Sequence, residues 1–339
     1  MASRPRLASW LDRVGALRTA KSLAVFMRLP PKEKVWRLRH SILSFVPIPI
    51  RIPAGAVWLA WDDELSERLY LGIPFEEGER MFVNRLLMPG DIVFDVGAHH
   101  GLYVLEASKK IGLKGAVFAF EPSPREFLRL RWHVLINRCG NVHTEPLALS
   151  SRDGTVELFI CLNEHTGMNS LRAPSGKPTS RVMVRAVALD DYVESNEIRL
   201  IDFMKIDVEG AELDVLKGST NILGSELPPI IMCEVQDVRT REWGYHASDI
   251  RDLLEIYGYR AFSVTENGRL QVCPKKNVYE ENLVFVPEAR LPKVAILIEA
   301  SHWSNDTQKY PLRSTPCGCS DYANDKYGTR DKNHRTGHD

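Results

Sequence analysis

The stretch DIVFDVGAHHGLY, residues 91–103, decides the fold of this 339-residue chain. An apolar run at 92–96 predicts a buried strand, and the spacing of apolar residues after Gly101 predicts a helix. A strand, a glycine turn and a helix form the first βα unit of a doubly wound sheet, in which ligands bind outside the carboxyl ends of the strands. We therefore expect Asp95 and the turn at Gly97 to face a ligand, with glycine letting the backbone pass close to it.

The rest of the chain continues this alternation and predicts an α/β fold. Strands separated by single helices indicate a mostly parallel, doubly wound sheet, and the closely spaced late strands indicate an antiparallel edge. The predicted strands are 92–96, 116–120, 142–149, 156–161, 182–187, 203–208, 230–235, 259–264 and 282–286, and the predicted helices are 101–111, 124–137, 213–223 and 250–257.

An acid at the end of the second predicted strand indicates that the ligand is a nucleoside. Glu121 follows the strand at 116–120, where a carboxylate can accept both hydroxyls of a ribose. The turn lacks the second glycine of a G-x-G-x-x-G fingerprint, and Asp95 would repel a pyrophosphate. The same carboxylate suits the ammonium or sulfonium of S-adenosylmethionine, so the pattern favours a methyltransferase over a dehydrogenase.

Four motifs together resemble the FkbM-type methyltransferases. They are GDIVFDVGAHHGLY, AFEPSP, NVHTEPLALS and MKIDVEGAELDVLKG, and the resemblance spans about residues 60–287. It implies a Rossmann-like class I methyltransferase fold, S-adenosylmethionine as the cofactor, and O-methylation of a hydroxyl on a small molecule or sugar. Members usually carry Asn where this chain has His99, which puts any role of that amide in doubt.

The resemblance also implies which residues serve the cofactor and the acceptor. Asp207 and Glu209 lie at the end of the strand at 203–208, where the acceptor hydroxyl would be held, and they are the candidate catalytic pair. The candidate cofactor residues are Asp95, Gly97, Ala98, His99, Gly101, Tyr103, Glu121 and Ala148.

The residues themselves allow two interpretations of the candidate catalytic pair. If the strand continues through Asp207 and Glu209, both carboxylates share one face, and their repulsion raises one pKa towards that of a useful base. Alternatively, Glu209 only caps the helix that begins near Ala211. Lys205 could pair with either acid or be a charge at a sheet edge, and Glu234 is another acid at the same rim.

Other polar side chains have less support, and we expect no metal site. His99 and His100 are neighbours on a loop, so we expect them to point apart and make a poor metal pair. Cys317 and Cys319, with distant histidines, lack the spacing of a zinc site. His165, and the pair Trp243 and Tyr245, could line an acceptor pocket, although a surface histidine and core-shielding aromatics fit equally well.

Charge and composition divide the chain into three parts. Residues 1–55 carry eleven Lys or Arg against two acids, a net charge of +9, whereas the whole chain has none. We expect a basic helical arm with an extended Pro-rich linker at 47–53, a methyltransferase domain at 56–290, and a polar, disordered tail at 301–339. The arm either packs on its own domain or lies on anionic lipid, and an Arg-rich organelle transit peptide is a further alternative.

The same features limit location and partners. Scattered cysteines suit a reducing compartment, and no apolar run approaches the length of a membrane span, so we expect a cytoplasmic protein. A balanced net charge gives no sign of nucleic-acid binding. A non-catalytic module that binds a nucleoside or a partner is the alternative to an enzyme, and the oligomeric state is open.

Overall fold

The structure is a computed structural model that describes residues 29–43, 46–161, 169–173 and 179–299. These residues form two compact units, one of which contains the described residues up to 52 together with 57–75, and the other 53–56 and 76–299. The amphipathic stretch before residue 29, His165 and the tail at 301–339 lie outside the described residues.

An eight-stranded sheet forms the centre of the larger unit. In spatial order its strands are β12 (Leu270–Val272), β11 (Tyr259–Val264), β13 (Glu280–Pro287), β10 (Ile230–Gln236), β9 (Phe203–Ile206), β3 (Ile92–Val96), β4 (Ala116–Phe120) and β5 (Val142–Glu145). The five strands from β10 to β5 are parallel, and β13 runs antiparallel between β10 and β11. The expected doubly wound sheet is confirmed, with its antiparallel pairs gathered at one end.

The strand order creates a switch point beside β3. The chain passes from β3 to β4 on one side and later adds β9 on the other, so Val96 lies opposite Phe120 in one ladder and Ile206 in the other. The connections diverge at this point and leave a crevice outside the carboxyl ends of the strands, which is where ligands bind in such sheets.

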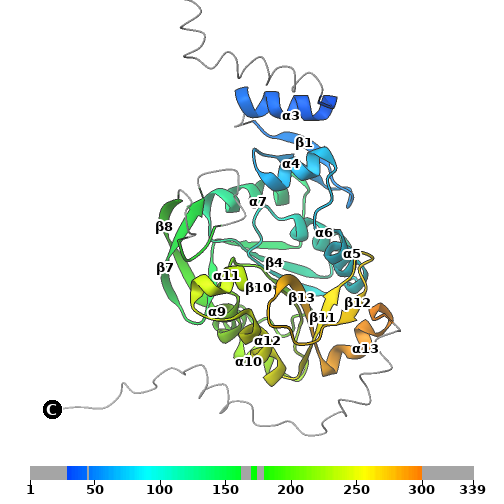
Figure 1. Cartoon of the computed structure of the whole chain (residues 1–339), viewed down its shortest axis with the longest axis vertical. Helices are drawn as coiled ribbons and strands as arrows, with labels where there is room; N and C mark the ends of the chain where they lie inside the picture. The colour runs from blue at the N-terminus through cyan, green and yellow to red at the C-terminus, as the bar shows by residue number, and fades with distance from the viewer. Residues whose placement is uncertain (1–28, 44–45, 162–168, 174–178, 300–339) are drawn as a thin grey trace, which may run out of the picture. The chain divides into compact units, whose positions relative to one another are not determined.

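Helices cover both faces of this sheet. Val93 packs with apolar residues from one group of helices, whereas Phe94 and Val96 pack with residues from the other group. The first group is α5 (Glu77–Leu86), α6 (Leu102–Ile111), α7 (Pro124–Ile136) and α13 (Leu291–Val294). The second is α8 (Leu189–Ser195), α9 (Glu212–Lys217), α10 (Thr220–Leu223) and α12 (Ala247–Ile256), of which the last three lie together in Figure 1.

A separate three-stranded sheet corrects one predicted strand. It has the order β6 (Ala148–Ser150), β8 (Thr179–Ala188), β7 (Gly154–Cys161). The predicted strand at 142–149 is in fact two strands, β5 and β6, in different sheets. Pro146 lies between them and has no N–H for a ladder, so it marks the break.

The smaller unit contains a two-stranded ribbon where the sequence predicted a linker. The helices and strands of this unit are α3 (Pro31–Ile42), β1 (Ile48–Arg51), β2 (Val57–Ala60) and α4 (Glu64–Leu71). The Pro-rich stretch is extended as expected, but its residues 48–51 pair antiparallel with β2. Asp63 caps α4 by accepting a hydrogen bond from the Ser66 amide at 2.9 Å. In the described part of the chain, no helix is long and apolar enough to cross a bilayer.

Candidate active site

Backbone hydrogen bonds join the glycine turn after β3 to the end of β4. The amides of Gly97 and Ala98 both donate to the carbonyl of Phe120, at 3.0 and 2.9 Å. The amide of His99 donates to Glu121 Oε2 at 2.8 Å, and that of Ser123 donates to Oε1 at 2.9 Å. Glu121 therefore lies at the same edge of the sheet as the turn, as the sequence predicted.

The two glycines of this turn are required by neighbouring protein. A Cβ on Gly97 would lie 1.8 Å from the carbonyl oxygen of Asp207, and one on Gly101 would lie 2.5 Å from Leu130 Cδ1. Both glycines have positive φ, of 83° and 87°. The expectation that Gly97 is bare only to admit a ligand is therefore incomplete, because tight packing of the β3 turn against the end of β9 already excludes a side chain.

A buried lysine links the turn to the candidate catalytic residues. Lys205 is 6% exposed and donates to Asp207 Oδ2 at 2.7 Å, and its ammonium lies 5.0 Å from the centre of the Tyr103 ring. Tyr103 in turn donates its hydroxyl proton to Glu76 Oε2 at 2.8 Å. β9 lies inside the sheet, so Lys205 is a buried ion-pair partner and not an edge charge.

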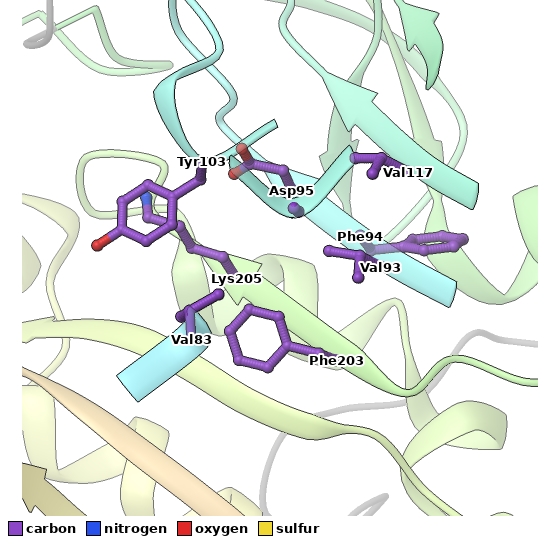
Figure 2. A pocket seen from close by; sticks show the side chains of 9 residues that line it. Val83, Val93, Phe94, Asp95, Tyr103, Val117, Phe203 and Lys205 are labelled. Atoms are coloured by element: carbon purple, nitrogen blue, oxygen red, sulfur yellow. The ribbon is translucent and has the colours of Figure 1, made fainter. Parts of the chain in front are cut away.

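Figure 2 shows Lys205, Tyr103 and the carboxylate of Asp95 directed towards one another. They line a cavity with room for about one water molecule, which Val83 and Phe203 close on the apolar side. Burial is the largest influence on the pKa of Lys205 and lowers it, but the combined charges of Asp207, Asp95 and Glu76 outweigh burial and raise the pKa. The ammonium is therefore charged at neutral pH.

Asp95 and Glu121 are both acids with raised pKa values. Burial raises the pKa of Asp95 to about 6, with Lys205 opposing the shift. Burial also raises the pKa of Glu121 to about 8, although its two backbone hydrogen bonds oppose the shift. Asp95 Oδ1 is buried and has no hydrogen-bond partner in the described structure, so it can accept a hydrogen bond from a cationic ligand.

The two histidines of the turn stack instead of pointing apart, so that expectation is wrong. Their ring centres are 3.7 Å apart and the rings are inclined by only 16°. His99 has φ of 50°, which turns the chain so that both rings follow one direction. Asn and His are both enriched in this left-handed conformation, so a histidine fits the backbone at this position. Burial lowers the pKa of His99 to about 4, and that of His100 well below its usual value, so both are neutral.

A turn, and not a continuing strand, brings Asp207 and Glu209 together. β9 ends at Ile206, and Glu209 has φ of 56°. One carboxylate oxygen of Asp207 and one of Glu209 nevertheless lie within 4.8 Å of each other. The N-cap of the next helix, α9, is Ala211, which makes no side-chain capping hydrogen bond. Glu212, the first residue of α9, instead accepts from the amides of Val208 and Gly210, in the turn before the helix, at 3.0 and 3.1 Å.

Two acids beside this pair, Glu212 and Glu234, have raised pKa values. Burial raises the pKa of Glu212 to about 7. Burial, with the charges of Asp207 and Glu209 next in size, raises the pKa of Glu234 well above its usual value. Glu209 forms an ion pair with Arg239 at 3.0 Å, and Asp207 has Lys205. The sequence placed Glu234 at the rim but gave no sign of Arg239 or Glu76, because their positions follow from tertiary packing.

The aromatic candidates flank this turn. Tyr245 donates its hydroxyl proton to the Gly210 carbonyl at 2.7 Å, and a Cβ on Gly210 would lie 2.4 Å from the Trp243 ring. Ser170 donates to the Glu209 carbonyl at 2.9 Å, and the Arg172 guanidinium lies 5.4 Å from the centre of the Trp243 ring. These side chains form a wall beside the carboxylates.

Ala148 differs from the other candidates. It begins β6 and its side chain is 4% exposed, packed among the apolar residues of the three-stranded sheet. The sequence predicted that Ala148 lies at the end of the strand beside β4, and this prediction is wrong. The strand beside β4 ends at Glu145, and the chain then enters the small sheet.

The sequence is similar to several known methyltransferases. Residues 95–261 match the family described as Methyltransferase FkbM domain. The hexuronic acid methyltransferase AglP of Haloferax volcanii is 35% identical over 227 residues, which cover 65% of this chain and 77% of that protein. The 31-O-demethyl-FK506 methyltransferase FkbM of Streptomyces tacrolimicus is 29% identical over 217 residues, covering 55% of this chain and 77% of that protein. The 2-O-methyltransferase NoeI of Sinorhizobium fredii is 26% identical over 159 residues, covering 42% of this chain and 63% of that protein.

Proposed function

This chain belongs to the FkbM methyltransferase family and is an S-adenosylmethionine-dependent enzyme, and we propose that it methylates a hydroxyl of a sugar or a similar small molecule. The names of relatives support this acceptor class, since one acts on a hexuronic acid and two are named for O-methyl positions. The observation that carries the proposal is the position of Asp207. Its backbone carbonyl lies against the Gly97 turn at the switch point of the sheet, and one of its carboxylate oxygens lies within 4.8 Å of one of Glu209.

We assign the cofactor to the edge formed by the β3 turn and the end of β4. In this assignment Glu121 would accept the ribose hydroxyls, and the unpartnered Oδ1 of Asp95 would accept a hydrogen bond from the cationic amino-acid end. Gly97, Ala98, His99, Gly101 and Tyr103 form the turn and the start of the helix that would hold it. Ala148 keeps only a backbone role in this assignment. When bound, S-adenosylmethionine supplies a methyl group on a positively charged sulfur, which is already activated for transfer to oxygen.

The chain itself has two tasks in such a transfer. It must hold the acceptor oxygen in line with the methyl group, and it must receive the proton that the hydroxyl loses. We assign both tasks to Asp207 and Glu209. Their counterions Lys205 and Arg239 fix the orientation of the carboxylates, and the wall of Trp243 and Tyr245 gives a sugar ring an apolar surface to lie on.

Mass spectrometry of an acceptor panel tests this proposal. The purified chain is incubated with methyl-labelled S-adenosylmethionine and with uronic acid glycosides, neutral glycosides, amines and RNA. We expect labelled methyl groups on hydroxyls of the glycosides. Transfer to amines or RNA, with none to any glycoside, would rule out the proposed acceptor class while leaving the cofactor assignment intact.

A further inference from the structure

A cluster of three carboxylates lies at the ends of β9 and β10. Asp207 follows β9 directly, Glu209 comes from the turn after it, and Glu234 comes from β10, one residue beyond the pairing of Cys233 with Ile206. Each of these three residues has one carboxylate oxygen that lies within 4.8 Å of a carboxylate oxygen of both other residues. Three points with such separations all lie within about 2.8 Å of a common centre, and small side-chain rotations bring them to the 2.0–2.6 Å of metal–oxygen bonds.

Two members of the cluster have an ion-pair partner, whereas Glu234 forms no ion pair with any described residue. Lys205 contacts Asp207 at 2.7 Å, and Arg239 contacts Glu209 at 3.0 Å. Glu234 Oε2 exposes less than 1 Å² and has no hydrogen-bond partner within the described parts of the chain. A buried carboxylate without a partner is costly, so it must either keep a proton or receive a cation.

The structure therefore points to a site for one divalent cation held by Asp207, Glu209 and Glu234, and we propose that it takes Mg²⁺ or Mn²⁺. An all-carboxylate set suits hard cations that prefer oxygen ligands, and it lacks the nitrogen and sulfur ligands that zinc favours. Three protein ligands leave further positions on the cation for water and for an oxygen of a second molecule.

The alternative cluster in the described chain has weaker support. It contains His99, His100 and Glu126, which could also approach one ion. Glu126, however, already accepts hydrogen bonds from Ser123 and Arg125, and His100 Nε2 lies 3.1 Å from the Arg129 guanidinium. The carboxylate of Glu126 and the Nε2 atom of His100 are thus already used within the protein.

The use of this cation rests on the proposed function. A cation at the acceptor side of the crevice would bind the hydroxyl oxygen of the acceptor and lower its pKa. The O–H proton would then pass more readily to the second oxygens of the carboxylates or to water, and the resulting oxygen anion would be ready to accept the methyl group. A sugar with neighbouring hydroxyls, or with a carboxylate beside a hydroxyl, can bind such a cation through two oxygens.

Electron paramagnetic resonance of Mn²⁺ tests the site without any assay of activity. The full chain is dialysed against EDTA, freed of chelator and titrated with Mn²⁺, and the loss of the free-ion signal measures binding. We expect one Mn²⁺ per chain, displaced by Mg²⁺. Glu234→Gln should weaken binding at least tenfold, whereas Glu226→Gln, which removes one exposed carboxylate elsewhere, should leave it unchanged.

Three outcomes distinguish the cation site, the role of the cation in the reaction, and the proposed function. Binding well below one Mn²⁺ per chain, or equal binding by the wild type and the folded Glu234→Gln variant, overturns the site. Stoichiometric binding with full methyl transfer after EDTA treatment overturns the role of the cation in the reaction. Stoichiometric binding, lost in Glu234→Gln, supports the site even if no hydroxyl compound is methylated, in which case only the proposed function fails.

Discussion

Replacing Gly97 with alanine tests the packing of the turn after β3 against the backbone of Asp207, one of the two residues to which we assign catalysis. The new Cβ would lie 1.8 Å from the Asp207 carbonyl oxygen and 2.9 Å from its carbon. Neither backbone segment can move easily. The Gly97 amide donates to Phe120 at 3.0 Å, and the Asp207 amide donates to Val96 at 3.0 Å. The substitution must therefore push the end of β9 away from the turn by more than 1 Å, roughly the shortfall from an ordinary contact.

The expected loss of stability has two parts. Alanine at φ of 83° costs about 1 kcal/mol, and overpacking against backbone adds about 1–3 kcal/mol. Gly258 is a matched control, because its φ is 78° and a Cβ there would meet nothing within 4 Å. We therefore expect Gly258→Ala to lose about 1 kcal/mol and Gly97→Ala about 2–4 kcal/mol.

Urea unfolding followed by circular dichroism measures both losses, and calorimetry measures the affinity of each variant for S-adenosylmethionine. Gly97→Ala should also weaken cofactor binding and lower kcat/KM, whereas Gly258→Ala should change neither by more than about twofold. Equal stability losses in the two variants would refute the close approach of Gly97 to Asp207.

Four other substitutions have expected outcomes. Glu121→Gln should stabilise the cofactor-free protein at pH 8 but not at pH 4, while weakening S-adenosylmethionine binding at least tenfold. Since the pKa of Glu121 rises from 4.5 to about 8 on folding, wild-type stability falls by up to about 1.4 kcal/mol per pH unit across that interval, as urea unfolding at several pH values would show. Lys205→Met should lower stability by about 3–5 kcal/mol in the same assay, because it leaves the buried carboxylates of Asp95 and Asp207 without their ammonium. Asp207→Asn and Glu209→Gln should each reduce kcat by about 10²–10⁴ with nearly unchanged cofactor affinity, and unchanged turnover in both would remove the catalytic assignment.

Local chemistry explains what could be predicted of the fold. The apolar runs that became β3, β4 and β10 are bounded by turn residues and lie between segments with helical spacing. Their pairing then follows from the rules of βαβ connection. Pro146 could have predicted that the chain leaves the large sheet after β5 and enters the small sheet at β6, because proline interrupts the ladder. The pairing of β1 with β2 could not, because a Pro-rich extended stretch shows no preference for one partner.

Tertiary packing explains what was missed at the site. The sequence identified Asp95, Glu121 and Asp207 because each directly follows or ends a predicted strand. It could not show that Lys205 would lie buried among carboxylates, or that Glu234 would lie beside Asp207 and Glu209. Those relations depend on the order of β3, β9 and β10 in the sheet, which fixes the neighbours of each strand end.

Calorimetric titration of the full chain with S-adenosylmethionine, its demethylated product and NAD tests whether the end of β3 binds a sulfonium nucleoside. We expect the first two to bind at one site per chain, Asp95→Asn and Glu121→Gln to weaken both, and NAD to give no heat of binding. Binding of NAD without binding of the other two would contradict the assignment of the acid-lined crevice at the end of β3 to a sulfonium nucleoside.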